Sequence, residues 1–186
     1  MDRTIGNGTF CDLVSLSGGS KFTRAVALGD LTGGSVDIVI RNDDDQSKDV
    51  LLNNRDGTFL EAVPLPDLFT STASVALGGL DGDGWVDIAI VNDIEMVNQV
   101  FINVGDGNGT FLDAMALLGA DYSTQAVPIA ELASDGAVDI VVGNGFQNLQ
   151  MIVNNPAEDG TYLDPIPLPG DDLPSQAIAL WSILVW

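Results

Sequence analysis

Residues 76–90 read ALGGLDGDGWVDIAI, in which three aspartates precede an alternating run of apolar residues. The pattern returns as VALGDLTGGSVDIVI at 26–40 and as VPIAELASDGAVDIV at 127–141. The closing Val-Asp-Ile of each stretch places an aspartate at position 37, 87 or 139. A period of about 50 residues is typical of stacked supersecondary units, such as the coils of a solenoid or the blades of a propeller.

Two further markers have the same period. A turn that contains Gly-Thr ends in an aromatic residue at Phe10, Phe59, Phe111 and Tyr162. An apolar run ends in asparagine within residues 50–54, 100–104 and 151–155. Three markers in one register establish the repeat more firmly than any one of them alone.

The second unit, about 73–122, contains four short apolar runs separated by turns rich in Gly, Asp and Asn. Their alternation and their Val and Ile content predict strands, and no stretch has a helical period. We therefore expect an all-β fold of β-propeller-type four-stranded blades, with three complete repeats plus split terminal strands. A β-solenoid is a minor alternative, because its coils would be shorter.

We expect one repeat domain over residues 1–186. Its parts are an orphan strand at 1–20, blades at 21–66, 73–118 and 124–169, and a partial blade at 175–186.

The composition excludes several classes of function. The chain has no histidine and one cysteine, so it has neither His-based catalysis nor an intrachain disulfide. A net charge of −21 argues against nucleic acid as a partner. No apolar run reaches the roughly 18 residues that a membrane span needs. Paired aspartates can hydrolyse glycosides, but these recur once per repeat, unlike a unique active site. We therefore expect no enzyme.

The consensus VALGDLDGDGxxDIVVxN…VxLNNGDGTF can be followed through all three units. In this respect the chain resembles the FG-GAP/VCBS repeat family, the integrin-α-like β-propeller repeats, over nearly its whole length. The resemblance implies an extracellular or cell-surface location, although no signal peptide is visible in this chain. It also implies a calcium loop between the first two strands of each blade, and no catalysis.

Calcium binds six to eight hard oxygens at about 2.3–2.6 Å, and aspartates at alternate positions of a Gly-bent loop supply them. The family places ligands at loop positions one, three, five and nine, and a backbone carbonyl at seven. The second loop matches with Asp81, Asp83 and Asp87 at three, five and nine and with the Trp85 carbonyl at seven. It has Gly79 at position one.

The other two loops match less well. The third keeps Glu131, Asp135 and Asp139 but has alanine at position three; the first keeps Asp30 and Asp37, with Thr32 as a weak third oxygen. We therefore expect weak Ca²⁺ binding, at about 10⁻⁴–10⁻³ M, mainly in the second and third repeats. The alternative is ordinary Asp-Gly turns, whose carboxylates are solvated or accept backbone N–H groups.

The ends of the chain predict self-association. Three blades cannot close a ring, whereas four to eight can, so the split terminal strands need partners. The candidate assembly interface is apolar and consists of Phe10, Trp181, Ile183, Leu184, Val185 and Trp186. All six basic residues lie in the first 55 positions, and nineteen acids follow with no base. This asymmetry favours attraction between the head of one copy and the tail of another, unless it is only drift in an acidic surface.

We therefore expect a structural protein that self-assembles head-to-tail, as a filament or a ring, by sharing strands between the terminal partial blades. A ring closed within one chain, an eight-bladed ring of two chains and a piece of a longer protein remain alternatives. The competing class is a secreted or cell-surface binding module that recognises glycan or protein, for which the loop aromatics are Trp85, Tyr122 and Phe146. Asn7 and Asn108 begin Asn-Gly-Thr triplets, which are N-glycosylation acceptors and also favoured turn sequences.

Overall fold

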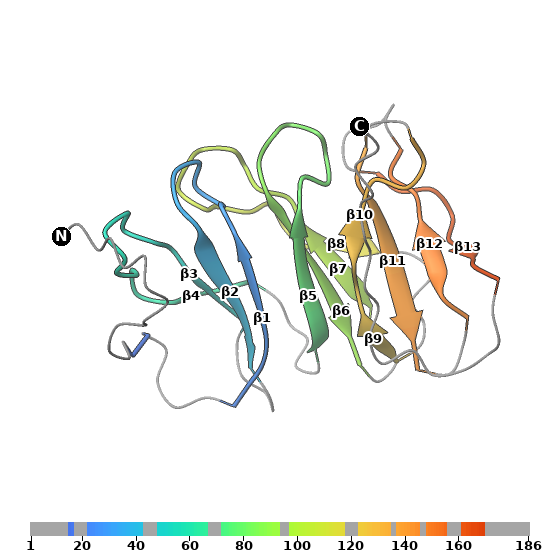
Figure 1. Ribbon diagram of the computed structural model, residues 1–186, viewed down its shortest axis with the longest axis horizontal. Helices are drawn as coiled ribbons and strands as arrows, with labels where there is room; N and C mark the ends of the chain where they lie inside the picture. The colour runs from blue at the N-terminus through green and yellow to red at the C-terminus, as the bar shows by residue number, and fades with distance from the viewer. Residues whose placement is uncertain are drawn as a thin grey trace, which may run out of the picture.

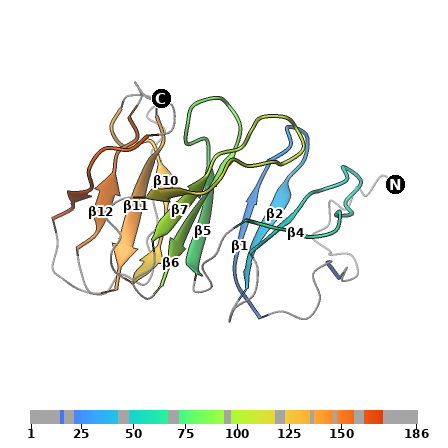
Figure 2. The ribbon, with the colours of Figure 1, turned by 180° about the vertical axis from the view of Figure 1, so that it is seen from behind.

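The computed structural model describes residues 15–16, 22–42, 48–66, 72–93, 97–117, 123–134, 137–145, 148–155 and 161–169. Over these residues the fold consists of strands and turns, without a helix. The strands form three antiparallel sheets that follow one another along the chain (Figures 1 and 2). Within the same residues no helix is long and apolar enough to cross a membrane.

The sheets share one strand order. The first is β1–β2–β3–β4, with β1 (Thr23–Gly29), β2 (Asp37–Asn42), β3 (Asp49–Leu51) and β4 (Val63–Pro64). The second is β5–β6–β7–β8, with β5 (Thr72–Gly78), β6 (Asp87–Asn92), β7 (Asn98–Phe101) and β8 (Met115–Leu117). The third is β10–β11–β12–β13, with β10 (Ile129–Ala130), β11 (Asp139–Asn144), β12 (Gln150–Ile152) and β13 (Ile166–Pro167).

The third sheet differs in its first strand. β9 (Thr124–Ala126) pairs with the far end of β11, whereas β10 pairs with its near end. Together they occupy the place of β1 and β5, and Pro128 lies between them. Because proline has no N–H, it cannot donate to the ladder, and the strand is interrupted there.

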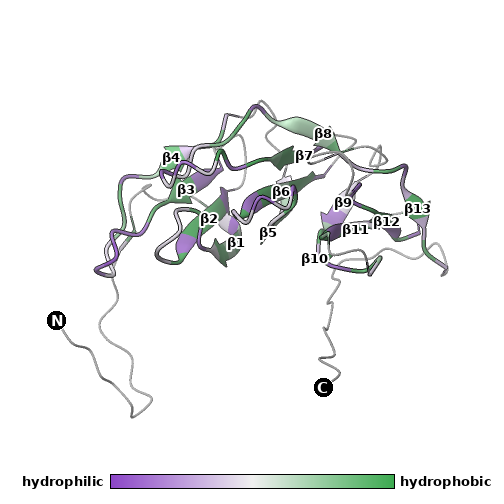
Figure 3. Ribbon diagram, turned by 90° about the horizontal axis from the view of Figure 1, so that it is seen from above, coloured by the Kyte–Doolittle hydropathy of each residue, from purple (hydrophilic) through white to green (hydrophobic). Residues whose placement is uncertain are grey.

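The all-β prediction and the four-strand order are confirmed. Seen from above, the described sheets form an open row, with β1–β4 at one end and β9–β13 at the other (Figure 3). The propeller and the domain boundaries stay predictions.

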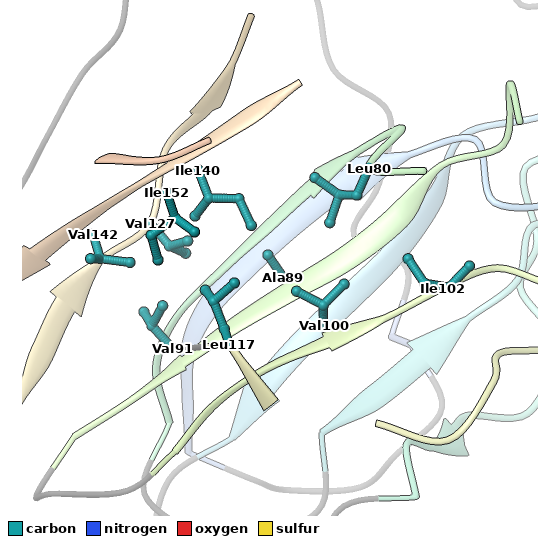
Figure 4. Packing of buried hydrophobic residues seen from close by; sticks show 10 residues of the cluster. All are labelled: Leu80, Ala89, Val91, Val100, Ile102, Leu117, Val127, Ile140, Val142 and Ile152. Carbon is teal, nitrogen blue, oxygen red and sulfur yellow. The ribbon is translucent and has the colours of Figure 1, made fainter. Parts of the chain in front are cut away.

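The core lies between successive sheets. Side chains alternate across a strand, so β6 buries Ile88 and Ile90 toward the first sheet and Ala89 and Val91 toward the third. The second junction is drawn in Figure 4, where Ala89 and Val91 lie near Ile140 and Val142 of β11, Ile152 of β12 and Val127. Each fully buried Val, Leu or Ile contributes roughly 1.5–3 kcal/mol. The middle sheet is therefore buried on both faces.

Candidate functional site: the loop ends of the sheets

In each sheet a buried aspartate holds the loop at one end of that sheet. These anchor aspartates are Asp37, Asp87 and Asp139, the first residues of β2, β6 and β11, and all are 0% exposed. In the second sheet, Asp87 Oδ2 accepts the Leu80 N–H at 2.5 Å and Oδ1 accepts the Asn103 N–H at 2.8 Å. The carboxylate thus joins the start of its loop to the residues after β7.

The other sheets repeat this arrangement. Asp37 accepts the N–H groups of Leu31 and Asn53, each at 2.8 Å. Asp139 accepts those of Leu132 at 2.8 Å and of Ala133 and Asn154 at 3.0 Å. Both oxygens of every anchor aspartate are therefore engaged by the backbone, which gives these repeated residues a structural role whether or not a cation binds.

Asp87 is the anchor aspartate of the middle sheet, which is covered by a sheet on either side, and its pKa is raised. Burial raises its pKa to about 6, against the opposing effect of the Asn103 and Leu80 N–H groups. The negative charges of Asp81 and Asp83 raise this pKa further. Burial also raises the pKa of the Tyr162 hydroxyl, which has no hydrogen-bond partner among the described residues, and the charges of Asp87 and Asp81 add to this effect.

The second loop folds its own carboxylates inward. Asp81 Oδ1 accepts the Asp83 N–H at 3.1 Å, and Asp83 Oδ1 accepts the Trp85 N–H at 2.8 Å. Gly82 and Gly84 permit these bends, because their φ angles are 77° and 93°. Burial raises the pKa of Asp81, and the nearby Asp83 charge also raises it. The loop therefore concentrates negative charge at Asp81 and Asp83.

The carbonyl at position seven faces the start of this loop. A methyl group on Gly79 would lie 3.2 Å from the Trp85 oxygen. The Trp85 ring lies elsewhere: it would be 3.0 Å from a methyl group on Gly33 and 2.8 Å from one on Gly105. The indole therefore packs between the loop of the first sheet and the turn after β7.

The first loop uses its carboxylates internally. Asp30 Oδ1 accepts the N–H groups of Gly34 at 2.9 Å, Thr32 at 3.2 Å and Ser35 at 3.3 Å. These bonds, the one from Gly34 above all, lower the pKa of Asp30. The Thr32 hydroxyl donates to Asp37 at 3.4 Å. Of the third loop, Glu131 is exposed, and the predicted ligand Asp135 lies outside the described residues.

Among the described residues, no group of three or more His, Cys, Asp or Glu side chains is placed to hold a metal ion. The donor chemistry nevertheless differs between loops. In both loops the carboxylates accept N–H groups, at Asp30 in the first and at Asp81 and Asp83 in the second. In the second loop Asp81 and Asp83 repel each other, which is the chemistry that a bound cation relieves. Calcium binding at these loops stays a prediction.

Asparagines join the second and third sheets to the sheet before them. The bridging asparagines, Asn103 and Asn154, follow β7 and β12, and Asn53 has the same place after β3. The Asn103 side-chain amide donates to the Leu31 carbonyl of the first sheet at 2.9 Å and to Val86 at 3.1 Å. Asn154 likewise donates to the Leu80 carbonyl of the second sheet and to Val138 at 3.4 Å.

The repeat pattern of the sequence contains these asparagines but does not indicate what they bind. Their side chains reach across 72 and 74 residues of sequence, which local patterns do not report. Their period, shared with the anchor aspartates, was the available signal. A polar residue at a fixed place in every repeat is a candidate for the contact between repeats.

An FG-GAP-like repeat model matches residues 34–90 and 79–142, so that more than half of the chain is matched. The chain belongs to the FG-GAP-like repeat family. The two matched ranges run from within the first loop to within β11, and so include the second and third loops. The resemblance inferred from the repeat motifs is thereby confirmed.

A lectin of Agrocybe aegerita has a similar structure. Its structure is titled for the specific recognition of non-reducing terminal N-acetylglucosamine. The sequences are 26% identical with a TM-score of 0.56, and the match covers 78% of this chain. It covers 38% of the lectin, so this FG-GAP-like chain spans well under half of that protein. The curated proteins contain no match.

The second and third of the FG-GAP-like sheets also insert apolar side chains against a glycine of the sheet before them. A methyl group on Gly29 would lie 2.9 Å from Leu77 Cδ1 and 3.4 Å from Val86 Cγ1. A methyl group on Gly78 would lie 3.0 Å from Ile129 Cγ2 and 3.7 Å from Val138 Cγ1. The two junctions of this chain are thus built by equivalent residues.

The outer surfaces of the FG-GAP-like row carry the unpaired halves of this junction. Val26, Leu28 and Val36 correspond to Val75, Leu77 and Val86, yet they are 54%, 65% and 53% exposed. At the other end Leu132 is 40% exposed, whereas the corresponding Leu31 and Leu80 are 0% exposed. The predicted interface residues Phe10, Trp181, Ile183, Leu184, Val185 and Trp186 lie outside the described residues.

A groove of about 350 Å³ separates the outer strands of the first two FG-GAP-like sheets. Its lining is mainly apolar and comes from β3, β4 and the turn before Phe111: Val50, Leu52, Val63, Pro64, Leu65, Pro66, Asn108, Gly109, Thr110 and Phe111. Asn108 is exposed on this turn, and its N–H donates to Asp106 at 2.8 Å. Glycosylation of Asn7 and Asn108 stays a prediction, and Asn7, Tyr122 and Phe146 lie outside the described residues.

Proposed function

We propose that this chain is a non-enzymatic structural protein whose copies join head to tail through the contact that already joins its own sheets. One observation carries the proposal: the contact occurs twice between the described sheets, and the outer face of the first sheet has the side chains that the outer face of the third sheet would receive. In this view the sheets are propeller-type blades, and further copies supply the neighbours that the outer two of the described sheets lack.

The head surface consists of Val26, Leu28, Val36 and the amide of Asn53. Leu28 and Val36 correspond to the side chains that insert against Gly29 and Gly78. The Asn53 amide donates to the Val36 carbonyl at 3.0 Å. Among the described residues it has no acceptor on another sheet, whereas Asn103 and Asn154 each have one.

The tail surface consists of Ala130 and Leu132, with the Leu132 carbonyl. That carbonyl corresponds to those of Leu31 and Leu80, which accept the bridging amides of the next sheet. On each outer face the exposed part lies near the loop that follows the first strand. Farther along the strands the face is covered, because Leu51 of the first sheet and Val141 of the third are buried. Head and tail are therefore open at corresponding places.

The energetic balance favours such a joint. Burying a leucine side chain contributes roughly 1.5–3 kcal/mol, and the joint would bury several apolar side chains at once. A contact between two different surfaces does not close by itself, so repeated joints give a filament or, if the rotation closes, a ring. The basic residues near the head and the acidic remainder favour the same orientation. An extracellular location accords with this family assignment and belongs to the proposal.

Sedimentation and electron microscopy test the proposal directly. The mass of the purified protein should rise with concentration, and linear or ring-shaped particles with a regular repeat should appear. A species of one chain at all concentrations up to the millimolar range would overturn the proposal.

We also propose that the second loop binds calcium weakly through Asp81, Asp83 and the Trp85 carbonyl. Calcium at a few millimolar should raise the melting temperature, because it relieves the repulsion between the two carboxylates, and EDTA should reverse the rise. Asp83→Asn should abolish the effect, whereas Asp106→Asn, in an exposed turn, should retain it. Equal calcium effects on both variants would exclude this loop as the site.

A second candidate function, a glycan-binding module, is favoured by the similar lectin and by the groove between the first two sheets. Phe111 and two prolines would supply apolar contact for a sugar ring, and Asn108 would supply a polar group. Titration with N-acetylglucosamine, followed by NMR, should then shift the signals of the groove, and Phe111→Ala should weaken binding about tenfold. Shifts elsewhere, or no shifts, would exclude glycan binding in this groove, and the structural function would be the remaining candidate.

A further inference from the structure

We infer that Ala130 makes the joint between copies weaker than the two junctions inside the chain, so that assembly is reversible while each chain stays folded. This inference rests on the proposed head-to-tail contact. It concerns the one position of the tail surface at which the third sheet departs from the other two.

The position is defined by strand register. Gly29 pairs with Asp37, Gly78 with Asp87 and Ala130 with Asp139. The three residues therefore occupy the same place, opposite the anchor aspartate of each sheet. Gly29 and Gly78 do not have a φ in the left-handed region, so backbone conformation does not require glycine there. What requires it is the space that the next sheet fills.

The available space is small at both internal junctions. A methyl group would lie 2.9 Å from the Leu77 side chain at Gly29 and 3.0 Å from the Ile129 side chain at Gly78. Both distances are far shorter than the separation of 3.5–4.0 Å at which carbon atoms attract one another best. Ala130 carries this methyl group.

A joining copy would place Leu28 against Ala130, because Leu28 is the counterpart of Leu77 and Ile129. The clash at Gly29 involves Cδ1, the end of a leucine side chain, which can rotate away. The methyl group would therefore displace the inserted leucine and loosen the contact without preventing it.

The consequence is a difference in strength between equivalent contacts. At each internal junction the position is glycine, the apolar side chain of the next sheet inserts fully, and the connecting chain keeps the two sheets together. The joint between copies has alanine, partial insertion and no connecting chain. Dilution should therefore separate copies without opening the sheets of any one of them.

Two blocked variants isolate a single joint for measurement. Leu132→Asp disables the tail surface and leaves a chain with a working head. Leu28→Asp disables the head surface and leaves a chain with a working tail, which is made with Ala, Gly or Val at position 130. A mixture of the two kinds can form only one head-to-tail pair, whose Kd follows from fluorescence anisotropy.

Ala130→Gly in the tail chain should tighten the pair about tenfold, and Ala130→Val should weaken it about tenfold or more. Valine favours strands, so the second variant remains informative if glycine destabilises β10. Melting curves of each tail chain, recorded alone, show whether it is folded.

The experiment distinguishes a failure of the proposed function from a failure of the inference about Ala130. If no mixture forms a pair up to the solubility limit, the proposed head-to-tail function is wrong. If pairs form with the same Kd whether position 130 is Gly, Ala or Val, the joint exists and the inference about Ala130 is wrong.

Discussion

Asp87→Ala should lower the free energy of unfolding by about 3 kcal/mol, because two buried backbone N–H groups lose their acceptor. Those groups belong to Leu80 and Asn103, at hydrogen bonds of 2.5 and 2.8 Å. Asn154 of the third sheet donates to the Leu80 carbonyl of this loop, and the Trp85 ring of the loop lies against the loop of the first sheet, so the loss should affect both junctions. Urea denaturation at pH 7 measures the change.

Asp83→Ala is the matched control, because it removes a carboxylate of the same loop that is exposed and bonds one N–H. It should change stability much less. If Asp87→Ala unfolds at the same urea concentration as the parent protein, the anchor role of this residue is wrong.

Asp87→Asn should be milder than the alanine variant. Folding raises the pKa of Asp87 from 3.8 to about 6, so the folded state binds this proton more tightly than the unfolded chain does. The contribution of Asp87 to stability therefore falls as the pH rises through this interval. The neutral amide avoids that cost and retains one acceptor oxygen.

Leu28→Asp should hold the protein as single chains at concentrations where the parent associates, with an association constant at least about a hundredfold lower. The side chain is 65% exposed, so the isolated chain should fold and melt as before. In the joint, however, the substitution replaces a buried leucine by a carboxylate without a partner. Sedimentation velocity over a hundredfold range of concentration measures the difference.

Leu112→Asp provides the comparison, because Leu112 is 53% exposed and lies outside the head surface. It should leave association unchanged. Equal loss of association in both variants would point to general repulsion between acidic chains, and no loss in Leu28→Asp would exclude the head surface.

The sequence was sufficient to predict the sheets, because strand periodicity and turn residues are local properties. The second sheet illustrates this: its four runs became β5–β8 near the expected positions. The break in the third sheet at Pro128 was signalled by the residue itself but was not anticipated. A missing N–H interrupts a strand only if that N–H faces a partner, and this depends on register.

The candidate site was predicted in part. The aspartates that recur as Val-Asp-Ile were expected as calcium ligands, and this stays a prediction; in the structure they are buried and accept backbone N–H groups. Sequence cannot separate these roles, because the same carboxylate serves either one, depending on whether it is buried. The bridging asparagines and the glycines at 29 and 78 act between sheets, and contacts across about 50 residues or more leave only their period in the sequence.

The close fit at Gly29 and Gly78 also bears on how such a protein could be lengthened. Among the described sheets, the second is the one that is completed on both sides, with Leu77 to insert into a preceding neighbour and Gly78 to receive a following one. A tandem duplication of this unit would join two surfaces that already match. A duplication of the third unit would instead place a methyl group in every new junction. Extended arrays of this type are therefore best designed from the middle repeat.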